Sequence, residues 1–441
     1  MLKRIFVLII CWMSFFQPVV AARKKAPEPS KPYPVKNEKI EYFKGGKRQV
    51  DKQKKPVVGL TGVRKEYYAG AKGKLRAEKS YKEGILDGLT KFYARDGKLR
   101  EEINYVQGKR EGIRREYLPD GSLSAERNYK DDQLSDLSKE YYANGHLQKE
   151  EIYYNNRLNG LSRQYYESGK LKAEENFVNN LRGGPAHYYD EEGNLREEKN
   201  YKVGRREGTQ TKYRSDGTKE IEEEYQLDMK NGAARTYYEN GKLQNEKIFK
   251  DDEQNGSVRN YAENGTVLAE GNYVHTKKSG LFKFYYPDGK LQSESNFFNN
   301  QLEGPGKKYY SNGNVAEEVN YVNGQATGEV KNYYDNGKLE QEGSIVNGKP
   351  HGPYKRYYRD GRIQSQGTYT SGIQDGAARY YHENGKLKQE ENYVNGQLHG
   401  TVNIYDATGK LTIQNFYKNG QLTGKKVYEG EDNDDNPVKG K

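Results

Sequence analysis

Histidine, cysteine and serine are the side chains that most often carry catalysis or metal binding, and this chain offers few of them in a usable pattern. Its six histidines stand at unrelated positions without metal-ligand spacing. Its single cysteine, Cys11, lies in an apolar N-terminal run, so a processed chain would hold no disulfide, thiolate metal site or cysteine nucleophile. No Ser/His/Asp set, phosphate-binding loop or paired-carboxylate motif stands out. We therefore expect no catalytic residue, no metal site, no cofactor and no enzymatic activity.

Glutamate is abundant, but it recurs with a constant step of 24 residues. The series has thirteen members between Glu78 and Glu390, and Gln366 and Gln414 take the two remaining places. Acid–base catalysis needs two carboxylates whose surroundings differ, whereas a repeat gives every member similar surroundings. We interpret the series as partners for lysine and arginine on adjacent strands.

Tyrosine is the dominant aromatic residue, with 41 copies against 12 Phe and one Trp. One tyrosine recurs with the same step, and rows of such rings would supply burial in a chain poor in aliphatic residues. A second tyrosine follows the first in many periods and is expected on the wetter face. A row of rings there would suit peptidoglycan, another glycan or an extended peptide. The candidate binding residues are Tyr142, Tyr166, Tyr238, Tyr286, Tyr310, Tyr334 and Tyr358.

A glycine marks the period. From Gly73 to Gly409 a glycine stands at every twenty-fourth position, which gives fifteen periods, and repeat positions are counted from this landmark glycine. A second glycine lies at plus fifteen, except at Asp136. Plus two is aliphatic except at Lys219, and plus eight is aromatic except at Ile345. The predicted turn glycines include Gly97, Gly121, Gly145, Gly169, Gly241, Gly289, Gly337 and Gly385.

Two runs of alternating polar and apolar residues lie in each period, which predicts two antiparallel strands per repeat. Pro119-Asp120-Gly121 favours a three-residue loop, in which a type I turn is followed by a left-handed glycine. That loop pairs the tyrosine at minus four with the aliphatic residue at plus two. It also places both on an apolar face with plus eight, opposite the glutamate at plus five. A two-residue loop would instead pair the basic residue at minus six, such as Arg163, with that glutamate, and both loops remain open.

The fold follows from the inability of one hairpin to bury its own apolar face, so that hairpins must add edge to edge. The predicted fold class is all-β, an elongated open antiparallel sheet of about fifteen tandem 24-residue β-hairpin repeats with a disordered N-terminal tether. Four segments are expected: a signal peptide at 1–22, a basic proline-containing linker at 23–57, the repeat array at 58–424 and a polar acidic tail at 425–441.

The N-terminus has the pattern of a secretory signal peptide. Lys3 and Arg4 precede an apolar run, and Val19-Val20-Ala21-Ala22 supplies small residues for cleavage. An uncleaved anchor is the lesser alternative, because the run is shorter than the roughly 20 residues that cross a bilayer. We expect an exported protein of the periplasm, the outer membrane surface or the extracellular space.

The net charge of +11 comes mainly from the segment before the array. Residues 22–55 hold twelve Lys or Arg and four acidic residues, whereas the chain from residue 56 onward holds 60 basic and 59 acidic residues. A near-neutral array does not predict nucleic acid as a partner. The basic segment 23–55 suits a flexible tether or a contact with an anionic membrane surface.

Several segments resemble MORN repeats in the bacterial variant found in proteins labelled YwqK-family antitoxins. Examples are Tyr141-Tyr142-Ala143-Asn144-Gly145-His146-Leu147 and Tyr237-Tyr238-Glu239-Asn240-Gly241-Lys242-Leu243. The resemblance covers roughly residues 62–424, and it implies stacked antiparallel hairpins with roles as scaffold, dimerisation module or phospholipid binder. An antitoxin would be expected where its toxin is made, which fits an exported chain poorly.

We therefore predict a non-enzymatic exported repeat scaffold that binds an unknown protein or a cell-envelope polymer along a long β-sheet. The alternatives are association with an anionic membrane surface and an antitoxin-like, toxin-neutralising role.

Overall fold

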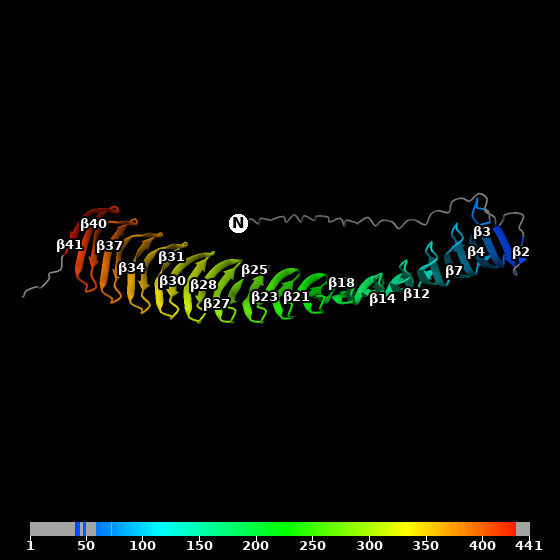
Figure 1. Cartoon of the computed structure of the whole chain (residues 1–441), viewed down its shortest axis with the longest axis horizontal. Coiled ribbons are helices and arrows are strands. Elements are labelled where there is room, and N and C mark those ends of the chain that lie inside the picture. The colour runs from blue at the N-terminus through cyan, green and yellow to red at the C-terminus, as the bar shows by residue number, and fades with distance from the viewer. Residues whose placement is uncertain (1–39, 45–46, 50–58, 72, 429–441) are drawn as a thin grey trace, which may run out of the picture. The chain divides into compact units, whose positions relative to one another are not determined.

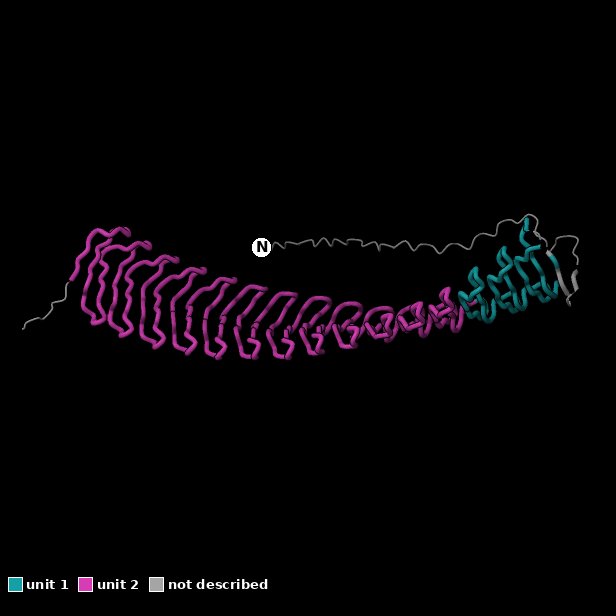
Figure 2. Tube along the Cα trace, viewed as in Figure 1, with its two compact units in different colours: residues 1–132 teal, residues 133–441 magenta. Residues whose placement is uncertain are grey.

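The structure is a computed structural model that describes residues 40–44, 47–49, 59–71 and 73–428. These residues form strands and turns, and no helix among them is long and apolar enough to cross a membrane. The chain divides into two compact units, residues 1–132 and 133–441 (Figure 2). The predicted signal peptide, most of the basic segment 23–55 and the tail beyond Tyr428 lie outside the described residues.

Strands of both units are labelled in Figure 1. In the first unit they are β1 (Ile40–Lys44), β2 (Lys47–Gln49), β3 (Gly62–Tyr67), β4 (Leu75–Lys82), β5 (Ile85–Leu86), β6 (Gly88–Tyr93), β7 (Leu99–Val106), β8 (Lys109–Arg110), β9 (Gly112–Tyr117) and β10 (Leu123–Lys130).

The second unit begins with β11 (Gln133–Leu134), β12 (Asp136–Tyr141), β13 (Leu147–Tyr154), β14 (Arg157–Tyr165), β15 (Leu171–Val178), β16 (Leu181–Tyr189), β17 (Leu195–Lys202), β18 (Arg205–Arg206), β19 (Gly208–Tyr213), β20 (Lys219–Gln226), β21 (Met229–Tyr237), β22 (Leu243–Lys250), β23 (Glu253–Tyr261), β24 (Val267–Val274), β25 (Lys277–Lys278) and β26 (Gly280–Tyr285). It continues with β27 (Leu291–Phe298), β28 (Gln301–Tyr309), β29 (Val315–Val322), β30 (Gln325–Tyr333), β31 (Leu339–Val346), β32 (Lys349–Pro350), β33 (Gly352–Tyr357), β34 (Ile363–Thr370), β35 (Ile373–Gln374), β36 (Gly376–Tyr381), β37 (Leu387–Val394), β38 (Gln397–Leu398), β39 (Gly400–Tyr405), β40 (Leu411–Lys418) and β41 (Gln421–Val427).

Each strand pairs with its neighbours in sequence, so each unit is an open antiparallel meander. Strand β15, for example, pairs with β14 before it and with β16 after it. The predicted fold class of many antiparallel hairpins is confirmed. Figure 2 shows the hairpins of the second unit following one another side by side.

The loop at the landmark glycine has three residues. The Gly169 amide donates to the Tyr166 carbonyl and the Tyr166 amide donates to the Lys170 carbonyl, both at 2.9 Å. Gly169 has a φ of 86°, so a type I turn is followed by a left-handed glycine. Tyr165 pairs with Leu171, the register expected for this loop.

A β-bulge directly after this loop changes the face of the residues beyond it. Lys172 has no residue opposite it, and Arg163 consequently pairs with Glu174. Both pairings considered for the two alternative loops therefore occur in one hairpin. The expectation that Tyr165 and the glutamate lie on opposite faces was wrong, because one inserted residue inverts the alternation of side chains along the strand.

The second turn of each repeat has two residues. Val178 pairs with Leu181, and the intervening Asn179 and Asn180 have φ values of 50° and 69°. Two left-handed residues in succession make a type I′ turn, whose twist matches that of paired strands. Each repeat therefore uses two different turns.

Equivalent positions line up in rows across the strands. Glu150 pairs with Arg163, which pairs with Glu174 on the next strand. We use the name ladder face for the side of the sheet formed by repeat positions minus six, minus four, plus two and plus five. The opposite side, the inner face, is formed by repeat positions minus seven, minus five, plus four, plus six and plus eight.

The inner face holds the core. Each hairpin is bent (Figure 1). Most of the buried side chains occupy inner-face positions. Small residues suit such a crowded surface. Buried apolar inner-face residues are Ala77, Ile103, Ala125, Ala173, Ala186, Tyr225, Val258, Phe282, Val319, Ala378 and Val402.

The predicted linker at 23–57 contains two strands that we did not expect. Strand β1 pairs with β2 and with β3, and the Tyr67 hydroxyl donates to Glu41 at 2.9 Å. Gly45-Gly46 between these strands is a turn signal, but the surrounding lysines favoured a tether. At the other end, β41 reaches Val427, three residues beyond the predicted array, because Lys425 still pairs with Asn415.

Candidate functional site

The ladder face joins each repeat to the one before it through tyrosine and glutamate. The Tyr165 hydroxyl at minus four donates to a carboxylate oxygen of Glu150, at plus five of the preceding repeat, over 2.9 Å. Both side chains are only partly exposed. The same contact links Tyr93 to Glu78, Tyr117 to Glu102, Tyr213 to Glu198, Tyr237 to Glu222, Tyr285 to Glu270, Tyr309 to Glu294, Tyr333 to Glu318 and Tyr357 to Glu342.

Basic residues at minus six connect successive glutamates. The Arg163 guanidinium lies 3.2 Å from Glu150 and 2.7 Å from Glu174, so one cation bridges two repeats. Arg115 and Arg235 bridge their neighbouring glutamates in the same way. The interpretation of the glutamate series as partners for cations is confirmed, and these carboxylates are engaged in the fold.

The pKa shifts in this network point away from neutral pH. Burial, followed by the hydrogen bond to Glu150, raises the pKa of Tyr165 to about 12. The hydrogen bond from Lys307, followed by that from Tyr333, lowers the pKa of Glu318. A general acid or base works best with a pKa near the working pH, so a neutral phenol beside a carboxylate favours structure over proton transfer.

The seven candidate binding tyrosines make an identical contact with the next repeat. The Tyr142 hydroxyl donates to the Tyr165 carbonyl at 2.8 Å, and the rings are partly buried. The hydroxyls are therefore held by backbone. The other six candidates are Tyr166, Tyr238, Tyr286, Tyr310, Tyr334 and Tyr358, which donate to the carbonyls of Tyr189, Tyr261, Tyr309, Tyr333, Tyr357 and Tyr381 at 2.6–2.8 Å.

Asparagine at minus one provides a link between repeats that we did not predict. Asn240 accepts a hydrogen bond from the Lys242 amide, which closes its own turn, and donates its side-chain amide to the Glu263 carbonyl of the next turn, both at 3.0 Å. The Lys242 ammonium donates to the Asn264 carbonyl at 3.0 Å. The recurrence of Asn rather than Asp before many landmark glycines was the available signal, since only the amide can donate.

The predicted turn glycines all lie in the left-handed region. Their φ values run from 77° at Gly241 to 98° at Gly121. A Cβ at Gly97, Gly121, Gly145, Gly241 or Gly385 would have no heavy atom within 4 Å, so backbone conformation rather than space requires glycine there. The remaining members of the set are Gly169, Gly289 and Gly337.

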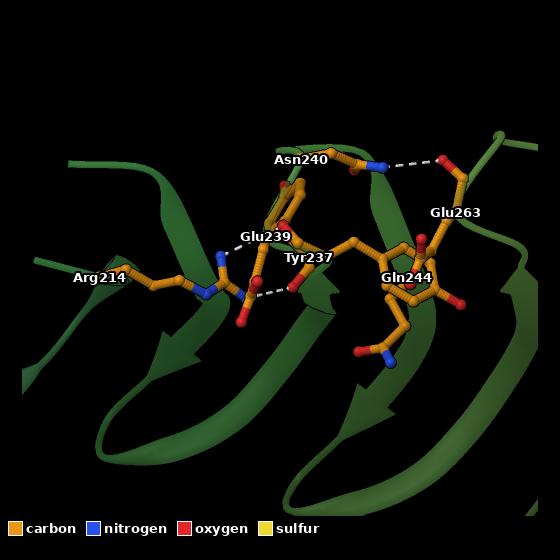
Figure 3. A pocket seen from close by; sticks show the side chains of 7 residues that line it. Arg214, Tyr237, Glu239, Asn240, Gln244 and Glu263 are labelled. Atoms are coloured by element: carbon orange, nitrogen blue, oxygen red, sulfur yellow. Dashed lines mark hydrogen bonds between the residues drawn. The ribbon is translucent and has the colours of Figure 1, made fainter. Parts of the chain in front are cut away.

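A hollow of about 630 Å³ opens beside Arg214, at minus three, where seven other repeats have tyrosine (Figure 3). The Arg214 guanidinium donates to the Lys219 carbonyl at 2.6 Å, to the Tyr238 carbonyl at 3.2 Å and to the Tyr237 carbonyl. Arg214 thus reaches the backbone of the next repeat as the tyrosines do. The lining also contains Glu239, Asn240, Gln244 and Glu263.

The inner face differs from the ladder face in how much its residues change between repeats. One inner-face row, formed by minus seven and plus six, changes in size and charge from strand to strand. It runs through Ser162, Glu175, Ala186, Lys199, Gln210, Glu223, Ala234, Lys247, Val258, Gly271, Phe282, Ser295, Gly306, Val319, Val330, Gly343, Tyr354, Gly367, Ala378 and Glu391. Among the described residues, no group of three or more His, Cys, Asp or Glu could hold a metal ion.

Comparison with protein families gives one match. The MORN repeat variant model matches thirteen segments, at 86–107, 110–131, 137–156, 158–179, 182–202, 230–251, 254–275, 278–299, 302–323, 326–347, 350–370, 374–395 and 398–419. The unmatched stretch 203–229 includes Lys219, the exception at plus two, yet it still forms β18, β19 and β20. Together the matched segments cover more than half of the chain.

Comparison with individual proteins adds no argument about function. No curated protein matches the chain. The crystal structure of TcdB2-TccC3 without hypervariable C-terminal region is 9% identical, with a TM-score of 0.15, and the match covers 84% of this chain and 24% of that chain. The crystal structure of TcdB2-TccC3-Cdc42 is 11% identical, with a TM-score of 0.11, and covers 81% and 26%. This chain therefore spans about a quarter of those chains, and scores this low support no inference.

Proposed function

Because this chain belongs to the MORN repeat variant family, we propose that it is an exported, non-enzymatic scaffold that binds a protein or a cell-envelope polymer along the inner face of its β-sheet. Family membership is the observation from which the β-sheet scaffold follows. Export, the partner and the binding face are our proposal.

The residues of the ladder face recur between repeats whereas those of the inner face vary, and this difference supports the proposal. On the ladder face, tyrosine, glutamate and a basic residue recur and bond to one another, as Tyr165, Glu150 and Arg163 do. On the inner face, neighbouring members of one row range from Gly271 to Phe282. A face whose residues recur can hold repeats together, whereas a face whose residues vary can distinguish ligands.

Export is tested by fractionating cells that produce the full chain with a C-terminal tag. The signal-peptide pattern at 1–22 motivates the experiment. We expect the tagged chain in the envelope or the medium, shortened by cleavage near Ala22. Recovery of the uncut chain from the cytosol alone would overturn the exported part of the proposal.

Binding is tested by immobilising the full chain and exposing it to solubilised envelope material from the same cells. A genuine partner should be retained on the full chain and displaced by excess free chain. A chain carrying Tyr165→Phe is the matched control, since this change affects the ladder face and should leave retention intact. Absence of any component that free chain displaces would contradict the scaffold role.

A further inference from the structure

One departure from the repeat and one residue without a side chain occur together in the repeat of Gly337. At plus eight, Ile345 stands where the other fourteen periods have tyrosine or phenylalanine. At plus six of the same repeat stands Gly343, which has no side chain. Both positions belong to the inner face, so this repeat has a smaller aliphatic side chain at one of them and no side chain at the other.

Two other inner-face glycines at plus six are covered by a ring. A Cβ added to Gly271 would lie 2.3 Å from the ring of Phe282, and one added to Gly367 would lie 2.8 Å from the ring of Tyr354. The three atoms nearest to a Cβ added to Gly343 include no ring atom. Its nearest neighbours would be the Tyr354 Cβ at 3.4 Å and the Pro353 carbonyl oxygen at 3.7 Å, which are ordinary contacts.

The uncovered glycine opens into a hollow of about 420 Å³ in the second unit, a size usual for small-ligand sites. No charged residue lines it, although 31% of the chain is charged and the hollow beside Arg214 includes Glu239 and Glu263. The lining residues are Val330, Asn332, Gln341, Gly343, Ser344, Ile345, Pro350, Gly352, Pro353, Tyr354, Tyr369 and Gly372.

The lining combines aromatic rings with neutral amides. The rings of Tyr354 and Tyr369 have centroids 4.9 Å apart and are tilted by 45°. Asn332 and Gln341 pair across adjacent strands, so their side chains share the inner face beside Val330 and Gly343. The Asn332 amide can donate and accept hydrogen bonds, as a hydroxyl-rich ligand requires. The Gln341 oxygen already accepts from the Arg356 Nε at 3.2 Å, which leaves the Gln341 NH₂ group as a donor. No charged side chain lines the hollow itself, so an ionic ligand would lose hydration there without a direct counter-charge; the cation beside it, Arg356, is the donor to Gln341.

We propose that this hollow binds one neutral pyranose unit of a glycan, of the N-acetylhexosamine class. The C–H face of the sugar packs on the tyrosine rings, the acetamide methyl enters the space above Gly343, and the amides of Asn332 and Gln341 bond to hydroxyl and acetamide groups. The inference rests on the proposed scaffold function and narrows its partner to a saccharide.

The test uses the full chain and the β-1,4-linked tetramer of N-acetylglucosamine, followed by saturation-transfer NMR and by titration calorimetry. We expect saturation transfer to the acetamide methyl. Gly343→Ala, Gly343→Val and Gly343→Phe should weaken binding progressively, by at least tenfold for phenylalanine. The backbone of Gly343 lies outside the left-handed region and its Cβ has room, so thermal unfolding should not shift downward for Gly343→Ala.

A second pair of variants keeps the test decisive if Gly343→Phe disturbs folding. Asn332→Ala should weaken saccharide binding, whereas Asn260→Ala, at the same repeat position outside the hollow, should not. Equal binding by all variants would overturn the assignment. So would a neutral proline-containing peptide that binds and is blocked by Gly343→Phe while the saccharide does not bind. In that second case the inner face still binds a partner, so the scaffold proposal survives and the saccharide inference alone fails.

Discussion

The hydroxyl of Tyr165 donates a 2.9 Å hydrogen bond to Glu150, a residue of the preceding repeat. Arg163, two residues before Tyr165, contacts the same carboxylate and that of Glu174. One carboxylate thus ties two hairpins together, and the arrangement recurs along the chain. The repeats are held edge to edge by side chains as well as by backbone hydrogen bonds.

Removing one hydroxyl from this network should loosen the contact between two repeats. We expect Tyr165→Phe to cost about 1 kcal/mol, the usual net value of a buried or half-buried hydrogen bond. Repeat arrays do not always unfold as one unit, so the measurement is amide hydrogen exchange in β13 and β14. Tyr154→Phe is the control, because Tyr154 is 61% exposed and should give no change. Equal loss of protection in both variants would show that the hydrogen bond is not responsible.

High pH should break the tyrosine–glutamate hydrogen bonds of the same network. Burial, together with the neighbouring glutamate, raises the pKa of Tyr165, Tyr237 and Tyr309 to about 12. Because these values exceed the value of about 10 for an unfolded tyrosine, the stabilisation is complete below pH 10 and is lost as the pH rises through 12. Phenolate absorbance and circular dichroism should change together between pH 10 and 12. Full titration of the tyrosines near pH 10 with the sheet intact would contradict this account.

The period of the chain predicted the fold because turns and strands leave strong local signals. The glycine step, the loop of Pro119-Asp120-Gly121 and the alternation of polar and apolar residues all correspond to the structure. The side-chain faces could not be predicted in the same way. The bulge residue, Lys172 in one repeat, has no distinctive type, and one unpaired residue is enough to move Glu174 to the face of Tyr165.

The hydrogen bond that asparagine donates to the next turn should make stability depend on whether Asn or Asp precedes the landmark glycine. Asn240→Asp keeps the oxygen that accepts from the Lys242 amide but removes the donor to the Glu263 carbonyl. We expect a loss of about 1 kcal/mol and faster hydrogen exchange in this turn and the next. Asp288→Asn is the reverse change in another repeat and should be neutral or slightly stabilising. Equal changes in stability and in hydrogen exchange for the two variants would show that the asparagine amide does not stabilise the contact between turns.

Asp136 occupies a backbone conformation that favours glycine. Its φ is 62°, and it stands at plus fifteen, where the other periods have glycine. Asp136→Gly should stabilise the second unit by up to about 1 kcal/mol, because the left-handed strain of an L-residue disappears. Gly208→Ala is the counterpart: its φ is 75° and its Cβ would have no atom within 4 Å, so any loss of stability comes from the backbone alone. Thermal unfolding should move up for the first variant and down for the second.

The candidate site was only partly accessible to sequence reasoning. The tyrosines from Tyr142 to Tyr358 were selected for their rings, but their hydroxyls are held by backbone carbonyls of the next repeat, a contact that depends on the spacing of hairpins in space. The hollow at Gly343 was marked in the sequence by Ile345, the one exception at plus eight. That exception became interpretable when the bulge placed plus six and plus eight on the face opposite the tyrosine at minus four.

The most direct test of the central claim compares two adjacent residues on opposite faces of β28. Lys307 lies in the ladder row, opposite Glu294 and Glu318, whereas Lys308 lies on the inner face, opposite Ser293 and Glu317. A photo-crosslinking phenylalanine analogue placed at one or the other position in the full chain is irradiated in cells. We predict adducts from position 308 and none from position 307. Adducts from position 307 alone would contradict the account, because the ladder face would then be the surface that binds.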